Sequence, residues 1–279
     1  MSTNTSMPEA QNLKLEHVVV SPEEWIAARK ELLKKEKEVT RLNDQVSAAR
    51  RQLPWVKVSK KYVFDAPGGP VALADLFAGR HQLVIQHFMF GPDWQEGCPS
   101  CSFMADHIDG ALPHLAARDV TLAVVSRAPL AKIEAFKKRM GWRFPWVSSY
   151  GGDFNADFHV SFTKEELAGG MVNYNYTLQE FPSAEAPALS VFYQDASGGV
   201  FHTYSTYGRG VEVLMGTYRI LDLVPKGRDE DHLSFEMEWV RHHDRYGTNE
   251  FADADKPYWP EAVSPSSSGC CCESPEANP

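Results

Sequence analysis

The middle of the chain alternates short, almost wholly apolar runs with helix-forming segments. Two of these runs, Gln82–Phe90 and Val120–Ser126, are bounded by turn residues, which is typical of strands buried on both faces. Helices are predicted from Cys98 onward and over Leu130–Met140, and Phe144–Val147 is predicted as a third strand. Because parallel strands need crossover connections, this order predicts an α/β fold built on a parallel sheet with right-handed crossovers.

Signals on either side extend this core. Ser21-Pro22-Glu23-Glu24 combines an N-cap, a first-turn Pro and a capping-box Glu, so it predicts the start of a long solvated helix that ends before Pro54. Val56–Phe64 is predicted as a strand because apolar and polar residues alternate. Ala186–Tyr193 and Val200–Tyr204 are predicted to form a β-hairpin, and Val211–Leu223 a helix.

These elements predict a domain organisation. We expect a disordered N-terminus over residues 1–20, an N-terminal helix over 21–53, a main domain over 54–253, and a disordered tail over 254–279. The main domain contains an irregular aromatic insertion at about 151–186. The N-terminal helix carries one narrow apolar stripe, which predicts packing on the domain or on a second subunit, the latter as a homodimer.

Charge and hydropathy exclude several classes of function. The formal net charge is −9, and an acidic surface repels phosphate backbones, so we expect no nucleic-acid partner. No apolar run approaches the roughly 18 residues of a membrane helix, and the polar N-terminus lacks the features of a secretory signal. The expected location is therefore cytoplasmic, with no membrane partner.

Two of the five cysteines form the motif Cys98-Pro99-Ser100-Cys101 at the predicted start of a helix. This spacing places both sulfurs within one turn, and the helix terminus stabilises a thiolate at the first position. An ordinary thiol with a pKa of about 8.5 is only about 3% thiolate at pH 7. We therefore expect Cys98 to be the attacking thiol and Cys101 the resolving thiol, with Pro99 placed in the first helical turn.

The alternative is a metal site. A structural zinc site needs four ligands, and the sequence has no second Cys-x-x-Cys, while His242 and His243 are adjacent and do not share one direction in regular structure. The tail carries three consecutive cysteines that are candidate auxiliary thiols or soft-metal ligands: Cys270, Cys271 and Cys272. An unselected tail remains the third interpretation. The redox interpretation needs no metal ion. No organic cofactor is expected either, since the chain lacks a Gly-rich dinucleotide fingerprint.

The segment H-F-M-F-G-P-D-W-Q-E-G-C-P-S-C-S-F, His87–Phe103, resembles a bacterial thioredoxin-like family. This family is catalogued as a domain of unknown function and often named a predicted dithiol-disulfide oxidoreductase. V-V-S-R-A-P-L at Val124–Leu130 and W-V-R-H-H-D at Trp239–Asp244 are similar to it as well, so the resemblance covers roughly Ser21–Tyr246. It implies an α/β, thioredoxin-like fold near the peroxiredoxin branch, with a central mixed β-sheet flanked by helices and an N-terminal helical extension. It also implies that Cys98 and Cys101 are the redox pair.

Three further residues are singled out by their places in the sequence. Thioredoxin-like folds keep a cis-proline beside the dithiol, and Pro187 stands at the corresponding place before a strand, although a trans edge-strand Pro remains the alternative. Trp94 is expected to pack or to form a substrate platform. His87 is expected either to tune Cys98 or to be a hydrogen-bonded core histidine.

The loop Asp93–Pro99 also resembles the peroxidatic loop Asp-Phe-Thr-x-x-Cys-Pro of peroxiredoxins. Gln95 replaces the Thr that positions peroxide, which argues against peroxidase activity. Arg127 and Arg143 are candidates for the arginine that such a site needs.

The sequence thus favours a cytoplasmic thiol–disulfide oxidoreductase that acts on a thiol or disulfide of a protein or small molecule and is recharged by an external thiol reductant. Two alternatives stay open: a thiol peroxidase, and a non-enzymatic metal-binding or interaction module built from Cys98, Cys101 and the tail cysteines.

Overall fold

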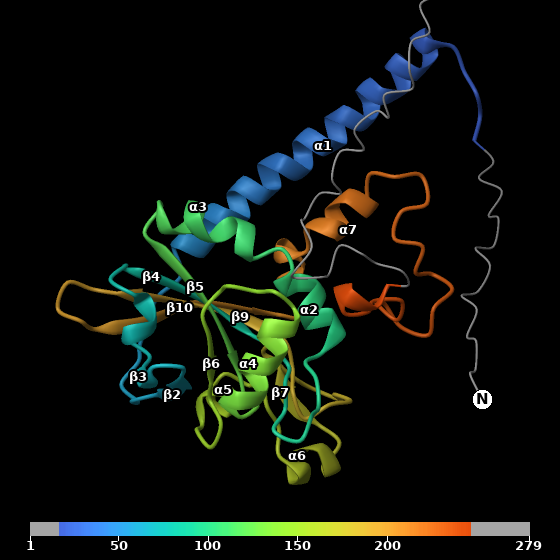
Figure 1. The fold of residues 1–279 in the computed structure, drawn as a ribbon. Coiled ribbons are helices and arrows are strands. Elements are labelled where there is room, and N and C mark those ends of the chain that lie inside the picture. Colours follow the sequence, from blue (N-terminus) through green and yellow to red (C-terminus); the bar gives the residue numbers. More distant parts are fainter. Residues whose placement is uncertain (1–16, 247–279) are drawn as a thin grey trace, which may run out of the picture.

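The structure is a computed structural model that describes residues 17–246. Within this range an eight-stranded sheet has the strand order β1-β10-β9-β4-β5-β6-β2-β3 (Figure 1). Its strands are β1 (Val56–Lys57), β2 (Val63–Ala66), β3 (Gly69–Ala72), β4 (Gln82–His87), β5 (Val120–Ser126), β6 (Trp146–Ser148), β9 (Ala188–Gln194) and β10 (Val200–Tyr207). A separate hairpin pairs β7 (Val172–Tyr174) with β8 (Thr177–Gln179).

Helices connect and cover these strands. The α-helices of the described residues are α1 (Pro22–Arg51), α2 (Pro99–Ala105), α3 (Leu112–Ala116), α4 (Leu130–Arg139), α5 (Phe154–Asp157), α6 (Lys164–Ala168) and α7 (Gly216–Leu221). Short 3₁₀ segments are η1 (Asp75–Phe77), η2 (Asp109–Ala111), η3 (Gly208–Leu214) and η4 (His243–Arg245). None of the helices in residues 17–246 is both long and apolar enough to cross a bilayer.

The centre of the sheet has the topology of a thioredoxin-like fold. β4 and β5 pair in parallel, as do β5 and β6, while β9 pairs antiparallel with β4 on the other side and with β10. The chain therefore runs from a strand through α2 to a parallel strand, and later returns as an antiparallel hairpin. The predicted fold class is confirmed, including the mixed sheet, its parallel middle, its hairpin and the N-terminal helix.

Two hydrophobic clusters lie on opposite faces of the sheet. On one face, Leu83 and Ile85 of β4 pack with Phe154 of α5. On the other, Phe88 packs with Phe136 of α4 and with Cys101 of α2. The dithiol helix thus lies on the same face as α4, with its inner side turned to the aromatic core.

Three segments differ from the sequence prediction. The helix predicted over Val211–Leu223 is divided at Met215 into the 3₁₀ segment η3 and the helix α7. Val56–Phe64 forms two strands instead of one, because β1 pairs with β10 whereas β2 pairs with β3 and β6. The polar residues between β1 and β2 carry the chain from one pairing to the other. The predicted irregular insertion contains α5, α6 and the β7–β8 hairpin, and its aromatic residues Phe154 and Tyr174 join the core.

The N-terminal helix forms as predicted and lies outside this core. Ser21 and Glu24 make the reciprocal capping-box hydrogen bonds at the start of α1. No residue of α1 is buried, and Figure 1 shows the helix (blue) extending away from the sheet. The expectations for residues 1–16 and for the tail over 254–279 lie outside the described residues.

Candidate redox site

The dithiol lies where β4 gives way to α2. Cys98 is the N-cap residue of α2, and Pro99 occupies its first turn, where a missing N–H costs nothing. The Cys98 amide donates to the Met89 carbonyl at 3.0 Å, which ties the loop back onto the end of β4. Cys98 is half-buried and Cys101 is 2% exposed, and both are free thiols.

The two thiols have opposite pKa shifts. The pKa of Cys98 is lowered to about 7, mainly because Cys101 donates a hydrogen bond to its sulfur, with further help from the Cys101 and Ser100 amides at the helix start. Burial opposes this shift. The pKa of Cys101 is raised well above its ordinary value, because it is the donor to Cys98 and is itself buried. The arrangement therefore separates an ionisable outer thiol from a protonated inner one.

The loop before Cys98 is fixed by aromatic packing. Phe88 and Phe90 are essentially inaccessible to solvent, and burial of each such side chain contributes about 1.5–3 kcal/mol. Gly97 lies between the rings of Phe88 and Phe136, where an added Cβ would come within 2.6 Å and 2.8 Å of ring carbons. On the outer side, Lys132 donates to the carbonyls of Pro92 and Trp94 at 2.9 and 3.0 Å.

A segment near the C-terminal end of the described chain holds the same loop. The His242 ring lies within 3.0 Å of an Arg139 nitrogen at Nδ1 and 2.8 Å of the Gly97 carbonyl at Nε2. Because a guanidinium only donates, Nδ1 accepts and Nε2–H donates to Gly97. This is the neutral tautomer, and burial lowers the pKa of His242 in agreement with it.

Ion pairs surround this histidine. Arg139 bonds Asp244 at 2.7 Å and Glu96 at 2.8 Å, and Arg245 also pairs with Glu96. Glu96 is two residues before Cys98, so these contacts join α4, the dithiol loop and η4. The Trp239–Asp244 motif, which contributed to the family resemblance, contains His242 and Asp244. We call these two residues, together with Arg139 and Glu96, the His242 clamp.

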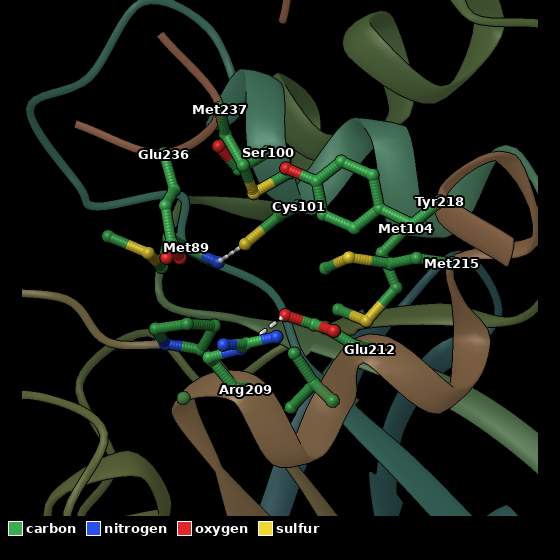
Figure 2. Close-up of a pocket in the computed structure, with 13 residues that line it drawn as sticks. Met89, Ser100, Cys101, Met104, Arg209, Glu212, Met215, Tyr218, Glu236 and Met237 are labelled. Carbon is green, nitrogen blue, oxygen red and sulfur yellow. Dashed lines mark hydrogen bonds and ion pairs between the residues drawn. The ribbon is translucent and has the colours of Figure 1, made fainter. Parts of the chain in front are cut away.

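Two cavities open beside the dithiol. One, of about 250 Å³, has Cys101, Ser100 and Pro187 in its wall together with four methionines: Met89, Met104, Met215 and Met237. Figure 2 shows the Cys101 thiol beside the Met89 amide, to which it is hydrogen-bonded at 3.5 Å, and the Met104 and Met215 thioethers close by. The other cavity, of about 280 Å³, is lined by Trp94, Glu96, Gly97, Cys98, Pro99, Arg241, His242 and Arg245.

A buried carboxylate lies on the inner side of the dithiol. Glu185 is 2% exposed, and burial raises its pKa to about 7 even though Arg127 lies 3.3 Å away. It is close enough for its charge to help raise the pKa of Cys101. The sequence analysis missed Glu185, since a single Glu in a segment without regular periodicity gives no signal of burial.

The other candidate residues fall into two groups. Pro187 lines the cavity of Cys101, and Trp94 and Pro99 line that of Cys98. The Ala186–Pro187 peptide is trans, so the trans alternative holds. The cysteines of the tail lie outside the described residues: Cys270, Cys271 and Cys272.

His87 is a core histidine and does not face the thiols. Side chains alternate along a strand, and Gln86 points to α2, where it donates to the Cys101 carbonyl at 3.3 Å. His87 therefore points to the opposite face, where it bonds Ser190 at 2.8 Å and stacks on Phe154. Burial lowers its pKa to about 3, which keeps it neutral.

Neither candidate peroxidatic arginine lines the Cys98 cavity. Arg127 pairs with Glu185, and Arg143 is 81% exposed and reaches Asp109 at 3.7 Å. As for metals, no group of three or more His, Cys, Asp or Glu side chains within residues 17–246 is arranged to hold an ion.

The packing around Gly97 predicts a substitution effect. Gly97→Ala should destabilise the reduced protein by about 1–3 kcal/mol, because the two phenyl rings must move to admit a methyl group. Urea unfolding followed by circular dichroism measures this loss. Gly110→Ala is the control, since an added Cβ there meets nothing within 4 Å. Equal effects at the two positions would contradict the packing described.

The solved structures that match this chain are distant from it. No curated protein matches the sequence. Peroxidoxin BcpB from Mycobacterium tuberculosis is 16% identical, with a TM-score of 0.40, over 60% of this chain and 97% of that one. A cysteine mutant of PrxQ from Xylella fastidiosa is 14% identical, with a TM-score of 0.36, over 57% and 88% of the two chains. A secreted Mycobacterium tuberculosis disulfide oxidoreductase homologous to E. coli DsbE is 18% identical, with a TM-score of 0.31, over 56% and 92%.

A sequence family gives the stronger relation. The profile of the family described as "Bacterial protein of unknown function (DUF899)" matches residues 14–246. This match spans the N-terminal helix, the dithiol and the His242 clamp, and covers most of the 279 residues. The chain therefore belongs to the DUF899 family.

Proposed function

We propose that this protein is a thiol–disulfide oxidoreductase whose reacting pair is Cys98 and Cys101. The observation that carries the proposal is the hydrogen-bonded pair itself: a half-buried thiol with a pKa of about 7 that receives a hydrogen bond from a buried thiol one turn further into α2. At pH 7 about half of Cys98 is thiolate, compared with about 3% for an ordinary cysteine.

The first step is attack by the Cys98 thiolate on a substrate disulfide. A bond forms between Cys98 Sγ and one substrate sulfur, the substrate S–S bond breaks, and the other sulfur leaves as a thiolate. Cys98 lines an open cavity, whereas Cys101 is almost completely buried, so the outer thiol is the one that a substrate reaches.

The second step is resolution by Cys101. Its sulfur attacks Cys98 Sγ, the intramolecular disulfide forms, and the second substrate thiolate leaves. Cys101 must lose its proton first, and its pKa is raised, so a base is needed. Glu185 is buried nearby with a pKa of about 7, and we assign it as the acceptor of that proton.

The methionine-lined cavity supports binding of an apolar substrate group beside the dithiol. Methionine side chains are flexible and polarisable, so they adapt to different apolar shapes. This suits a disulfide-bearing protein or small molecule. The oxidised protein then needs an external thiol reductant, which suits the thiol-rich cytoplasm.

A thiol peroxidase and a metal-binding module are the competing functions. Peroxide chemistry has less support, because Gln95 occupies the position of the peroxidatic Thr and neither Arg127 nor Arg143 lines the Cys98 cavity. Consumption of hydrogen peroxide by the reduced protein distinguishes the first alternative, and the metal content of the purified full chain distinguishes the second.

The thiol pKa gives the direct test of the site. In a full-length variant with all three tail cysteines replaced by serine, iodoacetamide should alkylate Cys98 with a midpoint near pH 7 and leave Cys101 unmodified. Mass spectrometry locates the label. Cys101→Ala should shift the midpoint upward, because the hydrogen bond from Cys101 is the largest cause of the lowered pKa. A midpoint near 8.5 in the parent variant would contradict the proposal.

The role of Glu185 predicts a separate kinetic effect. Glu185→Gln should slow resolution of a Cys98 mixed disulfide by at least about 10-fold at pH 7, since general-base catalysis typically contributes about 10²–10⁴. In the parent protein the rate should rise with pH and level off above about 7, where Glu185 is ionised, whereas the variant should lose this plateau.

Stopped-flow release of the second substrate thiol measures this step. Glu180→Gln, at an exposed position, is the matched control and should leave the rate and its pH profile unchanged. A Glu185→Gln variant that keeps both the rate and the plateau would exclude Glu185 as the proton acceptor.

A further inference from the structure

The cavity in front of Cys98 contains an arginine without an acidic partner. Arg245 is paired with Glu96, and Arg139 is paired with both Glu96 and Asp244. Within residues 17–246 no carboxylate forms an ion pair with Arg241, although Arg241 lines the cavity together with Cys98. Of these three arginines, Arg241 is therefore the one whose charge is not balanced by an ion-paired carboxylate among the described residues.

Arg241 is held in place by main-chain contacts. One of its terminal nitrogens, Nη1, donates to the carbonyls of Glu238 and Val240 at 2.7 and 2.9 Å. These bonds fix the guanidinium but leave its other nitrogens free of protein partners among the described residues. A guanidinium has five N–H donors in a planar fork, which matches the two oxygens of a carboxylate.

The rest of the cavity fits a small ligand. Its volume of about 280 Å³ is enough for a small molecule, and the Trp94 ring and Pro99 give it apolar wall next to the charged rim. Because Glu96 is already neutralised by two arginines, it offers little repulsion to an anion. The Cys98 thiolate itself repels an anionic disulfide, so a nearby unpaired cation is what allows such a substrate to approach.

We propose that the Cys98 cavity binds a small carboxylate-bearing disulfide, with its carboxylate on Arg241 and its S–S bond at Cys98. This inference rests on the proposed oxidoreductase function and names its substrate class. In the forward direction Cys98 forms a mixed disulfide with one half of the substrate. The substrate S–S bond breaks, and the other half leaves as a thiolate that carries a carboxylate. In reverse, the same acidic thiol reduces the Cys98–Cys101 disulfide.

The test compares two disulfides of different charge. The reduced protein, with its tail cysteines replaced by serine, is reacted with dithiobis(nitrobenzoate), which carries a carboxylate on each half, and with neutral hydroxyethyl disulfide. Arg241→Gln should slow the first reaction about 10-fold, as expected for loss of one charge-assisted hydrogen-bonded contact, and the second less than about 2-fold. Added salt at about 1 M should remove most of the difference.

Arg143→Gln is the matched control, because Arg143 is exposed and lies outside the cavity. It should leave both rates within about 2-fold of the parent protein. Equal slowing of the two disulfides by Arg241→Gln, or no slowing of either, would overturn the inference while the proposed function stands. A parent protein that reacts with neither disulfide would instead overturn the proposed function.

Helix α1 carries an exposed apolar repeat. Apolar residues recur every seven positions along this helix, at Trp25, Leu32, Val39 and Val46, and Leu53 continues the series directly after it. Each is 40–59% exposed. A repeat of seven keeps one apolar seam facing a neighbouring helix, which is the pattern of a coiled coil, and four heptads are enough to sustain one.

The partner that fits such a seam is a helix with the same repeat, and in this molecule that helix is α1 of a second copy. Ala28 and Ala49 lie on the same side of the helix as the seam and allow close approach of the two backbones, while Lys35 on that side is a polar residue of the kind that fixes register. We infer that α1 pairs two copies of the chain through a coiled coil.

Sedimentation of the full chain at micromolar concentrations measures the association. The parent protein should sediment as a dimer, and the double variant Leu32→Glu with Val39→Glu as a folded monomer. Lys30→Glu with Lys37→Glu changes the charge on the opposite side of the helix and should leave the dimer intact. A monomeric parent protein, or a control variant that dissociates as readily as the seam variant, would overturn this inference.

Discussion

The hydrogen bond between the two thiols of the Cys-x-x-Cys turn is the interaction on which the site depends. It lowers the pKa of Cys98 and raises that of Cys101, so one contact separates an ionisable outer thiol from a protonated inner one. The contact exists only while the first turn of α2 is held in place. The Cys98 amide donates a hydrogen bond to the Met89 carbonyl, and the Gln86 side chain donates one to the Cys101 carbonyl. These two bonds tie the turn to the end of β4.

The remaining structure holds this turn from both sides. Phe88 and Phe136 close on Gly97 from within the core, and neutral His242 bonds the Gly97 carbonyl from the C-terminal segment. Arg139 orients His242 and joins α4 to this segment. Residues some 145 positions apart in the sequence thus converge on the residue before Cys98. Of the two cavities beside the dithiol, one includes methionine side chains in its wall and the other arginine side chains.

The sequence was sufficient for the local features and insufficient for the long-range ones. The strands β4 and β5, the helix start at Cys98 and the hairpin after Pro187 follow from periodicity and turn residues, which are local signals. The face of the sheet to which His87 points depends on the register of β4. An almost wholly apolar run such as β4 does not reveal which of its side chains lie on which face. Glu185 and His242 act through burial and through contacts with distant segments, so no spacing rule could assign their roles. Val56–Phe64 shows the same limit, because its two halves pair with different strands.

If the proposed function is correct, Cys98 and Cys101 exchange two electrons as a unit. A redox titration measures this most directly: the variant without tail cysteines is equilibrated in thiol–disulfide buffers, quenched, and its free thiols are counted by mass spectrometry. Both thiols should disappear together in one two-electron transition to a Cys98–Cys101 disulfide, at a potential between about −270 and −120 mV, the range of dithiol oxidoreductases. Loss of Cys98 alone to a mixed disulfide, with Cys101 still reduced at every buffer potential, would contradict it.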